Sequence, residues 1–282
     1  MWPRSARRVI DGAGCETGAR MELGLRDKAC VVTGGSRGIG LATARLLAAE
    51  GASVLLVARS EESLADAAEQ CGERARTLAL DVTDKDAAAR VVEVCEQAFG
   101  GVDALVNNAG TTRARTIDEL TDADWQEQWE LHVMAPMRLM RECAPRMQAR
   151  GGGRIVNVCS SSGKRPSLRN VAYSVTKAAQ LSLSRAWADA WVGRGVLINA
   201  VAPGPADTGM WLDEGGLADQ AAAAGGLTRD EALEAARGKI PLGRFGGADE
   251  IASVVAFLCS EKASNVVGAA WSVDGGSVPT IL

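Results

Sequence analysis

The sequence predicts an α/β protein: a single domain with one doubly wound parallel sheet of about seven strands and helices on both faces of that sheet. Three observations support this prediction. Short apolar, β-branched runs alternate along the chain with amphipathic stretches of roughly 10 to 20 residues. The first apolar run leads directly into a glycine-rich loop, Gly34 to Gly40. Neither an internal repeat nor a linker marks a second domain.

The first half of the chain alternates without interruption. Strand 29–32 leads into the glycine loop, and the helix that follows it, 41–51, places Leu41, Ala44 and Leu47 on one face. Gly51 ends this helix. The next predicted elements are strand 53–57, helix 61–71, strand 77–80, helix 85–99 and strand 104–110. Short apolar runs of this kind are typical of parallel strands buried on both faces.

The second half continues this alternation with one interruption. Its predicted elements are a long helix 125–147 that contains Pro136, strand 154–158, helix 174–193, strand 196–204, helix 249–260 and strand 269–273. The Gly- and Ala-rich stretch 209–239 interrupts the alternation of predicted strands and helices. Glycines favour mobility, and we expect this stretch to form a flexible lid over a site; the glycines concerned are Gly215, Gly216, Gly225 and Gly226.

The N-terminal residues differ from the rest of the chain. Residues 1–23 are basic and Gly-rich, with no strand or helix period and no apolar segment of a secretory signal. We expect a disordered extension here, whether Met21 is the natural start or the stretch is a loose tail. A transit peptide is the third alternative. Residues 24–282 would then form the folded domain.

Composition and charge exclude several classes of protein. The 31 basic and 35 acidic residues leave a net charge of -4, which argues against a general nucleic-acid surface. No apolar run reaches the roughly 18 residues that a membrane helix needs. The seven cysteines are scattered without a CxxC pair and the chain has one histidine, so we expect no metal site. Reduced, buried thiols are typical of a cytoplasmic protein.

The loop "TGGSRGIG" (33–40) lies between the first strand and the first helix, and three of its four glycines, Gly34, Gly38 and Gly40, define its spacing. Glycine lets a backbone approach a pyrophosphate closely, while N–H groups at the start of the helix point toward it. The spacing, Gly-x3-Gly-x-Gly, differs from the GxGxxG of the dinucleotide fingerprint. By itself the loop indicates a nucleotide site, with a plain structural turn as the alternative.

The end of the second strand indicates which dinucleotide the loop would bind. An acidic residue at this place holds a ribose 2′-hydroxyl. Here Ala58 occupies the place and Arg59 follows, while Arg37 lies in the glycine loop. Two guanidinium groups can hold a 2′-phosphate. The sequence therefore favours NADP over NAD as cofactor; the alternative is that Arg59 only faces solvent.

The chain's only tyrosine, Tyr173, lies four residues before Lys177 on a predicted helix. Residues at this spacing share a helix face, so the two side chains should lie side by side. A neighbouring ammonium and a positively charged nicotinamide would both lower the phenol pKa from about 10, which makes a proton donor and acceptor near neutral pH. Ser160, Ser161 and Ser162 follow a predicted strand, at the edge where ligands of such sheets bind. An ordinary helix face and a serine-containing turn are the structural alternatives.

These motifs, in this order, resemble those of the short-chain dehydrogenase/reductase family over about residues 24–278. The loop 33–40 is similar to the family's cofactor loop, "NNAG" (107–110) to its strand-four motif, and "YSVTK" (173–177) to its Tyr-x3-Lys. Three further segments resemble the adenine-binding pair, the segment that holds the nicotinamide carboxamide, and the closing segments of the family: "LALDVTD" (78–84), "NAVAPGPADT" (199–208), and "IPLGRFG" with "SVDGG".

The resemblance implies a Rossmann-type fold and a dehydrogenase mechanism. It makes Tyr173 the acid/base and has Lys177 lower its pKa and bind the nicotinamide ribose. Ser160 lies 13 residues before Tyr173 and three before Gly163, as the family serine does, and would hold the substrate oxygen. Together with the charge argument, the resemblance assigns to the cofactor Gly34, Ser36, Arg37, Gly38, Ile39, Gly40, Arg59, Asp81, Val82, Asn108, Ala109, Gly110, Tyr173, Lys177, Pro203, Gly204, Ala206 and Thr208. The family usually forms dimers or tetramers, so a homodimer or homotetramer is expected.

One position departs from the family pattern. Seven residues after Trp125, where the family usually has an asparagine that helps position a water behind the lysine, the chain has His132, its only histidine. An imidazole can donate or accept a hydrogen bond there, but its charge varies with pH. Three interpretations remain: His132 substitutes in the proton relay as a catalytic residue, it only packs in the helix, or the protein is impaired or non-catalytic.

The expected activity is NADP-dependent interconversion of a ketone and a secondary alcohol, as a carbonyl reductase similar to the 3-oxoacyl-(acyl carrier protein) reductases. The alternatives are an NAD-dependent alcohol or hydroxysteroid-type dehydrogenase and a dinucleotide-binding sensor without turnover. Four apolar residues could form a pocket wall or ordinary core: Met210, Trp211, Leu212 and Leu217. Five basic residues could favour an anionic substrate or form a solvated face: Arg113, Arg115, Lys164, Arg165 and Arg169.

Overall fold

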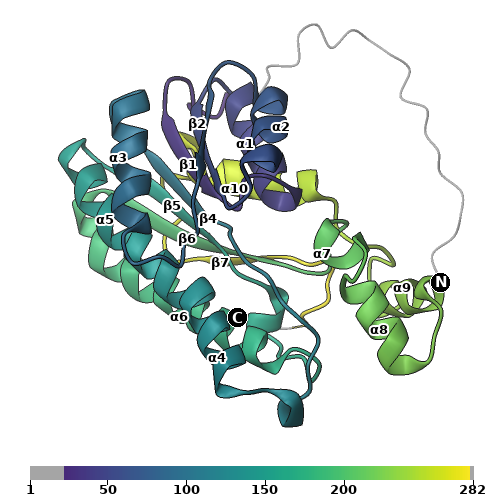
Figure 1. Cartoon of the computed structure of the whole chain (residues 1–282). Coiled ribbons are helices and arrows are strands. Elements are labelled where there is room, and N and C mark those ends of the chain that lie inside the picture. The colour runs from purple at the N-terminus through teal and green to yellow at the C-terminus, as the bar shows by residue number, and fades with distance from the viewer. Residues whose placement is uncertain (1–21, 280–282) are drawn as a thin grey trace, which may run out of the picture.

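One parallel sheet organises the fold in the computed structural model, which describes residues 22–279. The strand order is β3-β2-β1-β4-β5-β6-β7, and every neighbouring pair is parallel. The strands are β1 (Ala29–Thr33), β2 (Ser53–Ala58), β3 (Ala75–Ala79), β4 (Ala104–Asn107), β5 (Gly153–Val158), β6 (Val196–Pro203) and β7 (Ala270–Val273). The predicted doubly wound sheet is therefore confirmed (Figure 1). Strand order reverses between β1 and β4, the place where ligands of such sheets bind.

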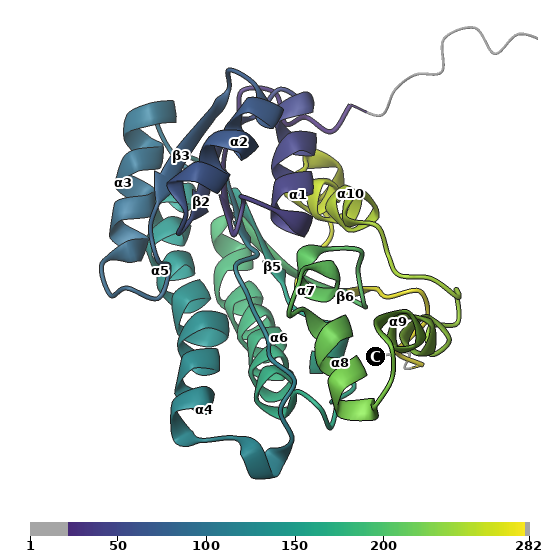
Figure 2. The same ribbon diagram turned by 45° about the vertical axis from the view of Figure 1, so that its right-hand side comes forward.

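Helices cover both faces of the sheet (Figures 1 and 2). One face carries α1 (Gly38–Ala49), α2 (Glu61–Cys71) and α10 (Ala248–Cys259). The other carries α3 (Ala87–Phe99), α5 (Ala135–Ala149) and α6 (Val171–Trp191). Short 3-10 turns complete the connections: η1 (Ile117–Glu119), η3 (Ser161–Gly163), η4 (Val192–Arg194) and η5 (Glu261–Ala263).

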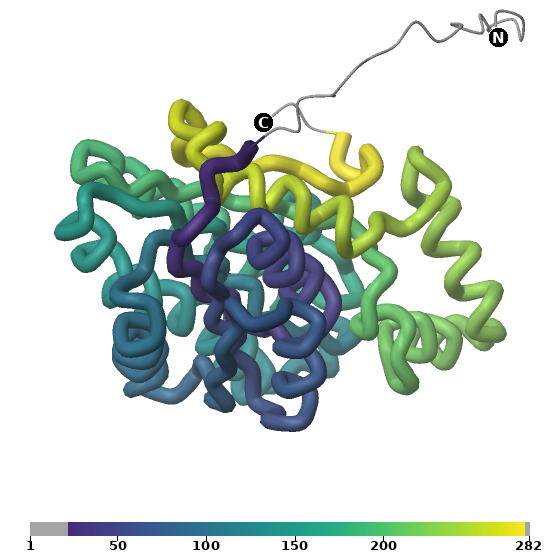
Figure 3. The backbone as a smooth tube through the Cα atoms, turned by 90° about the horizontal axis from the view of Figure 1, so that it is seen from above, coloured from purple at the N-terminus to yellow at the C-terminus, as the bar shows by residue number. Residues whose placement is uncertain are grey.

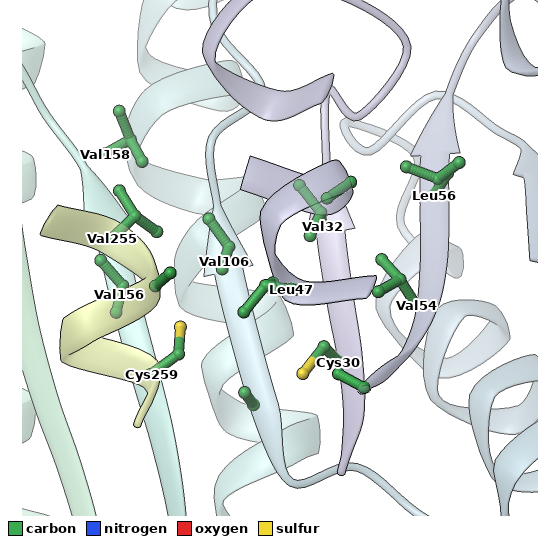
Figure 4. Packing of buried hydrophobic residues seen from close by; sticks show 14 of the residues in the cluster. Cys30, Val32, Leu47, Val54, Leu56, Val106, Val156, Val158, Val255 and Cys259 are labelled. Carbon is green, nitrogen blue, oxygen red and sulfur yellow. The ribbon is translucent and has the colours of Figure 1, made fainter. Parts of the chain in front are cut away.

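The core lies between the sheet and each helical layer. In β1 every residue is buried, and alternate side chains enter opposite layers. On the face shown in Figure 4, Val32 of β1 and Val106 of β4 point toward Leu47 of α1. Full burial of one such side chain stabilises the fold by about 1.5 to 3 kcal/mol. This continuous burial explains why the strands read as unbroken apolar runs.

The long helix expected at 125–147 is present as three continuous segments. A π-helical turn, η2 (Glu130–Met134), joins α4 (Asp122–Trp129) to α5. Pro136 lies at the start of α5, where the chain leaves this widened turn. A proline can occupy that place because the first turn of a helix does not need its N–H. The turn also carries His132 into the buried layer.

The stretch 209–239, where no helix or strand was predicted, is largely helical. It contains three helices: α7 (Gly209–Leu212), α8 (Leu217–Gly225) and α9 (Arg229–Arg237). They enclose a small core of their own, in which the Trp211 ring lies 4.9 Å from the Phe245 ring. Figures 1 and 3 show α8 and α9 projecting beside the sheet. Their role as a lid stays a prediction.

Two expectations concern the ends and the surface of the chain. Most of the predicted N-terminal extension, residues 1–23, lies outside the described residues. Within residues 22–279, no helix is both long enough and apolar enough to span a membrane.

Candidate active site

A cleft of about 480 Å³ opens at the C-terminal ends of β1, β2, β4, β5 and β6. Of the residues expected at the site, Gly40 and His132 do not line it. The expected residues that do line it are Gly34, Ser36, Arg37, Gly38, Ile39, Arg59, Asp81, Val82, Asn108, Ala109, Gly110, Ser160, Tyr173, Lys177, Pro203, Gly204, Ala206 and Thr208. The fold therefore brings together residues that are up to 174 positions apart, from Gly34 to Thr208.

The glycine loop forms a cradle that side chains would fill. Gly34 and Gly38 have φ values of +64° and +54°, a left-handed conformation that favours glycine. A Cβ on Gly40 would lie 2.1 Å from the carbonyl oxygen of Gly34. The loop can therefore fold back over the start of α1 only with glycine at this position. Free N–H groups at the start of α1 and a close backbone suit the pyrophosphate of a dinucleotide.

Asn108 braces this loop from the neighbouring strand. Its Nδ2 donates to the carbonyl oxygens of Thr33 at 3.0 Å and Gly34 at 3.2 Å. In return, Thr33 Oγ1 accepts from the backbone N–H groups of Asn108 and Ala109, at 3.0 and 3.1 Å. The end of β1 and the segment after β4 are thus held together directly below the cleft. The sequence did not single out Thr33.

The two basic residues expected at a 2′-phosphate both line the cleft. Arg59 is exposed at the end of this strand, and Arg37 is exposed in the glycine loop. The Arg37 guanidinium forms an ion pair with Asp213, which follows α7, at 2.9 Å. Nearby, Asp81 Oδ1 accepts from both the backbone N–H and the hydroxyl of Thr83, at 2.9 and 2.7 Å. These bonds fix the orientation of that carboxylate beside the cleft.

Tyr173 and Lys177 lie on α6, in its first two turns, and both face the cleft. The Lys177 Nζ lies 5.7 Å from the centroid of the Tyr173 ring. It donates to the carbonyl oxygen of Val158, at the end of β5, and to Gln180 Oε1, both at 2.9 Å. The lysine is 2 % exposed, so these bonds hold a buried ammonium. The spacing argument correctly predicted that the two side chains are neighbours.

In the protein without its cofactor, the pKa of the tyrosine lies above its ordinary value, and the predicted lowering by a bound nicotinamide stays a prediction. Burial raises the pKa of Tyr173 to about 12, against the opposing effect of a hydrogen bond with Ser160. Burial also lowers the pKa of Lys177 to about 8. Both groups are shielded from solvent, and burial disfavours the charged form of each, the phenolate of Tyr173 and the ammonium of Lys177. The protein's own groups thus leave the phenol protonated at neutral pH, and any lowering has to come from a bound positive charge.

Of the three serines, Ser160 alone lines the cleft; Ser161 and Ser162 lie in η3 beyond it. The backbone N–H of Ser162 donates to Ser160 Oγ at 3.1 Å. Since that bond uses an acceptor lone pair, the hydroxyl proton of Ser160 stays available to an oxygen in the cleft. Gly163 lets this turn pack on α6, because a Cβ there would lie 2.8 Å from the carbonyl carbon of Lys177.

His132 is fully buried in the π-helical turn, behind the tyrosine. Its Nδ1 lies 3.0 Å from Thr176 Oγ1, and the Thr176 hydroxyl donates to the carbonyl oxygen of Tyr173 at 3.0 Å. Because that hydroxyl has a single proton, Nδ1 carries the imidazole hydrogen and donates it to Thr176. Burial and the charge of Lys177 hold the pKa of His132 well below its usual range, so the ring is neutral. Within residues 22–279, its Nε2 has no hydrogen-bond partner.

Two further residues at the site, Thr176 and Gln180, were missed in the sequence. Both are buried on α6, on the face that also carries Lys177. The available signal was the pattern itself: a face of α6 that should be apolar carries polar residues beside the lysine.

The basic residues near the site are mostly engaged elsewhere. Lys164 Nζ donates to the carbonyl oxygen of Ala270 at 2.6 Å and to Ser272 Oγ at 3.0 Å. Arg115 pairs with Asp124 at 3.0 Å. These contacts support the interpretation of a structural and solvated face for these residues. Arg113 lines a small recess of about 30 Å³ next to Tyr173.

The apolar residues of 209–239 divide between the two roles that were considered for them. Met210 lines the cleft, and Leu212 packs on the small core of this stretch. Trp211 does both, because it lines the cleft and contacts Phe245.

Comparison with known proteins gives a consistent result. The family model described as short chain dehydrogenase matches residues 28–215. The 3-oxoacyl-(acyl-carrier-protein) reductase of Thermotoga maritima is 35% identical over 257 residues, which are 90% of this chain and 99% of that protein. The cis-4-hydroxycyclohexanecarboxylate dehydrogenase of Sinomonas cyclohexanicum is 38% identical over 254 residues, 89% of this chain and 96% of that protein.

Solved structures agree with this. The L-sorbose reductase of Gluconobacter frateurii, in complex with NADPH and L-sorbose, is similar with a TM-score of 0.87 and 39% identity. The match covers 93% of this chain and 100% of that chain.

Proposed function

Since the chain belongs to the short chain dehydrogenase family, we propose that it is an NADP-dependent carbonyl reductase that converts a ketone to a secondary alcohol. Membership of the family makes it an NAD(P)-dependent oxidoreductase that acts on CH–OH or carbonyl groups. The preference for NADP, the reductive direction and the site residues are the proposal. One observation carries it: Ser160, Tyr173 and Lys177 face the same cleft as the glycine cradle.

The proposed chemistry assigns one task to each of these side chains. A reduced nicotinamide, when bound, supplies the hydride that reaches the carbonyl carbon. The Ser160 hydroxyl donates a hydrogen bond to the carbonyl oxygen and holds it in place. The Tyr173 hydroxyl gives that oxygen its proton, which completes the alcohol, and the phenolate then regains a proton from solvent. The Lys177 ammonium stabilises this phenolate and binds the nicotinamide ribose.

The protonation state of Tyr173 suits a proton donor for reduction. A phenol with a pKa of about 12 carries its proton throughout the neutral range. Oxidation of an alcohol would need the phenolate instead, and the positively charged oxidised nicotinamide that is bound in that direction would favour it.

Two observations support NADP. Arg37 and Arg59 both line the cleft, Arg59 directly after β2, where the ribose of the adenosine half would lie, and no acidic side chain occupies position 58. The similar L-sorbose reductase was solved with NADPH. Guanidinium groups suit a 2′-phosphate and gain little from a 2′-hydroxyl.

We propose a positioning role for His132. Its ring contacts the ring of Tyr173, and its Nδ1–H reaches the tyrosine's own carbonyl through Thr176. A neutral imidazole there supports the orientation of the phenol without adding a charge beside Lys177. A part in a proton relay stays the alternative role.

We also propose that the chain forms a homodimer or homotetramer. The strand at the sheet edge, β7, is largely exposed, and it carries Trp271, which is 38 % exposed. Exposed aromatic residues on an open sheet edge favour a contact with another chain. Size-exclusion chromatography with light scattering would measure the number of copies, and a monomer would contradict the proposal.

The test of the proposed function uses a panel of ketones with NADPH and NADH. Fluorescence titration measures the binding of each dinucleotide, and loss of NADPH absorbance measures turnover, in the wild type and in Tyr173→Phe. We expect tighter binding of NADPH than of NADH, turnover of at least one ketone, and loss of about 100-fold or more in kcat for Tyr173→Phe with NADPH binding retained. Unchanged turnover in Tyr173→Phe, or binding of NADPH without turnover of any ketone, would contradict the proposal.

A further inference from the structure

The buried ammonium of Lys177 has two acceptors from the protein, and one of them is a side chain with no assigned role. An ammonium group has three N–H donors. One bonds the carbonyl oxygen of Val158 and a second bonds Gln180 Oε1, both at 2.9 Å. One donor therefore remains for a group in the cleft.

Gln180 is a polar side chain at a buried position, where apolar residues are usual. It is 1 % exposed, on the face of α6 that lies against the sheet. A buried amide costs about 1 to 3 kcal/mol unless its polar atoms are hydrogen-bonded. The contact with Lys177 satisfies its oxygen. Three positions separate the two residues, so they lie on the same side of the helix, one turn apart.

We propose that Gln180 is a positioning residue for Lys177, whose ammonium it holds at the end of β5 with one N–H directed to the cleft. The backbone carbonyl of Val158 fixes one direction of the ammonium, and the Gln180 amide fixes a second. Two fixed bonds remove most of the freedom of a long, flexible side chain. The proposal rests on the role proposed above for Lys177, but the contact can be tested without turnover.

The groups around Lys177 explain why the Gln180 oxygen matters for keeping the lysine charged. The titratable groups that face it are the Cys159 thiol after β5, the His132 imidazole on η2 and the Tyr173 phenol on α6 itself. Burial raises the pKa of Cys159 to about 12, so all three are neutral near pH 7. The two acceptor oxygens are then the main groups that stabilise the ammonium against burial, and burial already lowers its pKa to about 8.

The test compares Gln180→Leu, which removes the oxygen, with Gln180→Glu, which places a negative oxygen against the ammonium. Gln97→Leu, on the exposed side of α3, is the matched control for loss of a glutamine. The full chain is labelled with carbon-13 at the lysine ε carbons, and the resonance of Lys177 is identified by its absence in Lys177→Met. Its chemical shift is followed from pH 6 to pH 10, and kcat/KM for NADPH is measured over the same range.

We expect Gln180→Leu to lower the pKa of Lys177 by about one unit and Gln180→Glu to raise it. A shift of one unit would lower kcat/KM about tenfold at pH 9 and no more than about twofold at pH 6. Gln97→Leu should match the wild type. The proposal is overturned if the Lys177 titration is the same in the wild type and both Gln180 variants.

The two proposals fail in different ways. If no ketone is reduced by the wild type, the proposed function fails while the NMR titration still reports on the Lys177–Gln180 contact. If Gln180→Leu does not fold, the test rests on Gln180→Glu. A Lys177 pKa equal to that of the wild type in this variant would overturn the proposal.

Discussion

The imidazole of His132 lies edge-on against the ring of Tyr173, with the ring centroids 5.2 Å apart and the planes at 86°. An aromatic pair in this geometry stabilises its arrangement by about 0.5 to 1.5 kcal/mol beyond the burial of its area. The contact places the chain's only histidine against its only tyrosine, inside the proposed site. Four predictions follow from the buried groups around this pair and from the cleft beside it.

Replacement of His132 by asparagine should change how stability depends on pH. The folded protein keeps His132 neutral because its pKa is held well below the usual range, whereas the unfolded chain takes up a proton below about pH 6.5. Stability of the wild type therefore falls as the pH falls, by about 1 kcal/mol between pH 6.5 and 5.5 from this group. His132→Asn should lack this loss. Urea unfolding at both pH values measures it, and equal losses in the two proteins would contradict the prediction.

Replacement of Lys177 by methionine tests the other buried base. Its pKa of about 8 lies below the ordinary value of 10.5, so between these values the unfolded chain holds a proton that the folded protein has released. The wild type should therefore gain about 2 kcal/mol of unfolding free energy, relative to Lys177→Met, from pH 7 to pH 9.5. Denaturant unfolding measures this difference. Lys85→Met, on an exposed residue, is the control and should follow the wild type. A flat difference for Lys177→Met would show that the folded protein keeps this lysine protonated up to its ordinary pKa, which would contradict the prediction.

The ion pair between Arg37 and Asp213 should compete with the 2′-phosphate of NADPH. Both side chains are more than half exposed, so the pair contributes no more than about 1 kcal/mol. Asp213→Asn frees the guanidinium and should tighten NADPH binding by up to about fivefold, with NADH binding unchanged. Fluorescence titration measures both constants. Asp219→Asn, which removes the partner of Arg229 in the same stretch, is the control; an equal effect on NADPH and NADH would point to the stretch as a whole instead.

The cradle should not tolerate even one methyl group at Gly40. A Cβ would lie 2.1 Å from the Gly34 carbonyl oxygen and 2.5 Å from Asn108 Nδ2, so the loop has to move. Overpacking of this kind costs about 1 to 3 kcal/mol. Gly40→Ala should lose at least about tenfold in NADPH affinity and part of its stability. Gly193→Ala meets no atom within 4 Å and should keep both, which thermal unfolding and titration would show.

Much of the fold was predictable because buried strands leave a strong pattern. The strands β1, β2, β4 and β6 are mainly apolar runs. Helix α2 matches its predicted bounds, 61–71, because Ser60 caps it and Gly72 ends it. The helices within 209–239 were not predicted, for a physical reason. The helices α7, α8 and α9 have only four to nine residues each, so the hydrophobic period is too brief to detect.

The sequence indicated which residues would come together in the cleft, but it did not indicate how burial changes their pKa values. Motif spacing identified Ser160, Tyr173 and Lys177, which share one cleft. It could not give the direction of the tyrosine's pKa, because sequence spacing reveals a neighbouring charge but not the loss of solvent. Helix spacing places Gln180 on the same side as the lysine, but it does not show that the pair is buried, which is what makes the bond important.

The widened turn at Glu130–Met134 sets a limit on how this enzyme can be redesigned. The extra residue of a π turn rotates everything after it by about 100° relative to a regular helix. In α5 that rotation decides which side chains, among them Leu139 and Met140, enter the core. Deleting one residue would convert the turn to a regular α-helix. The His132 imidazole would then move away from the Tyr173 phenol, or the wrong face of α5 would turn toward the core. This single π turn therefore determines both the contact between the His132 and Tyr173 rings and the face of α5 that enters the core.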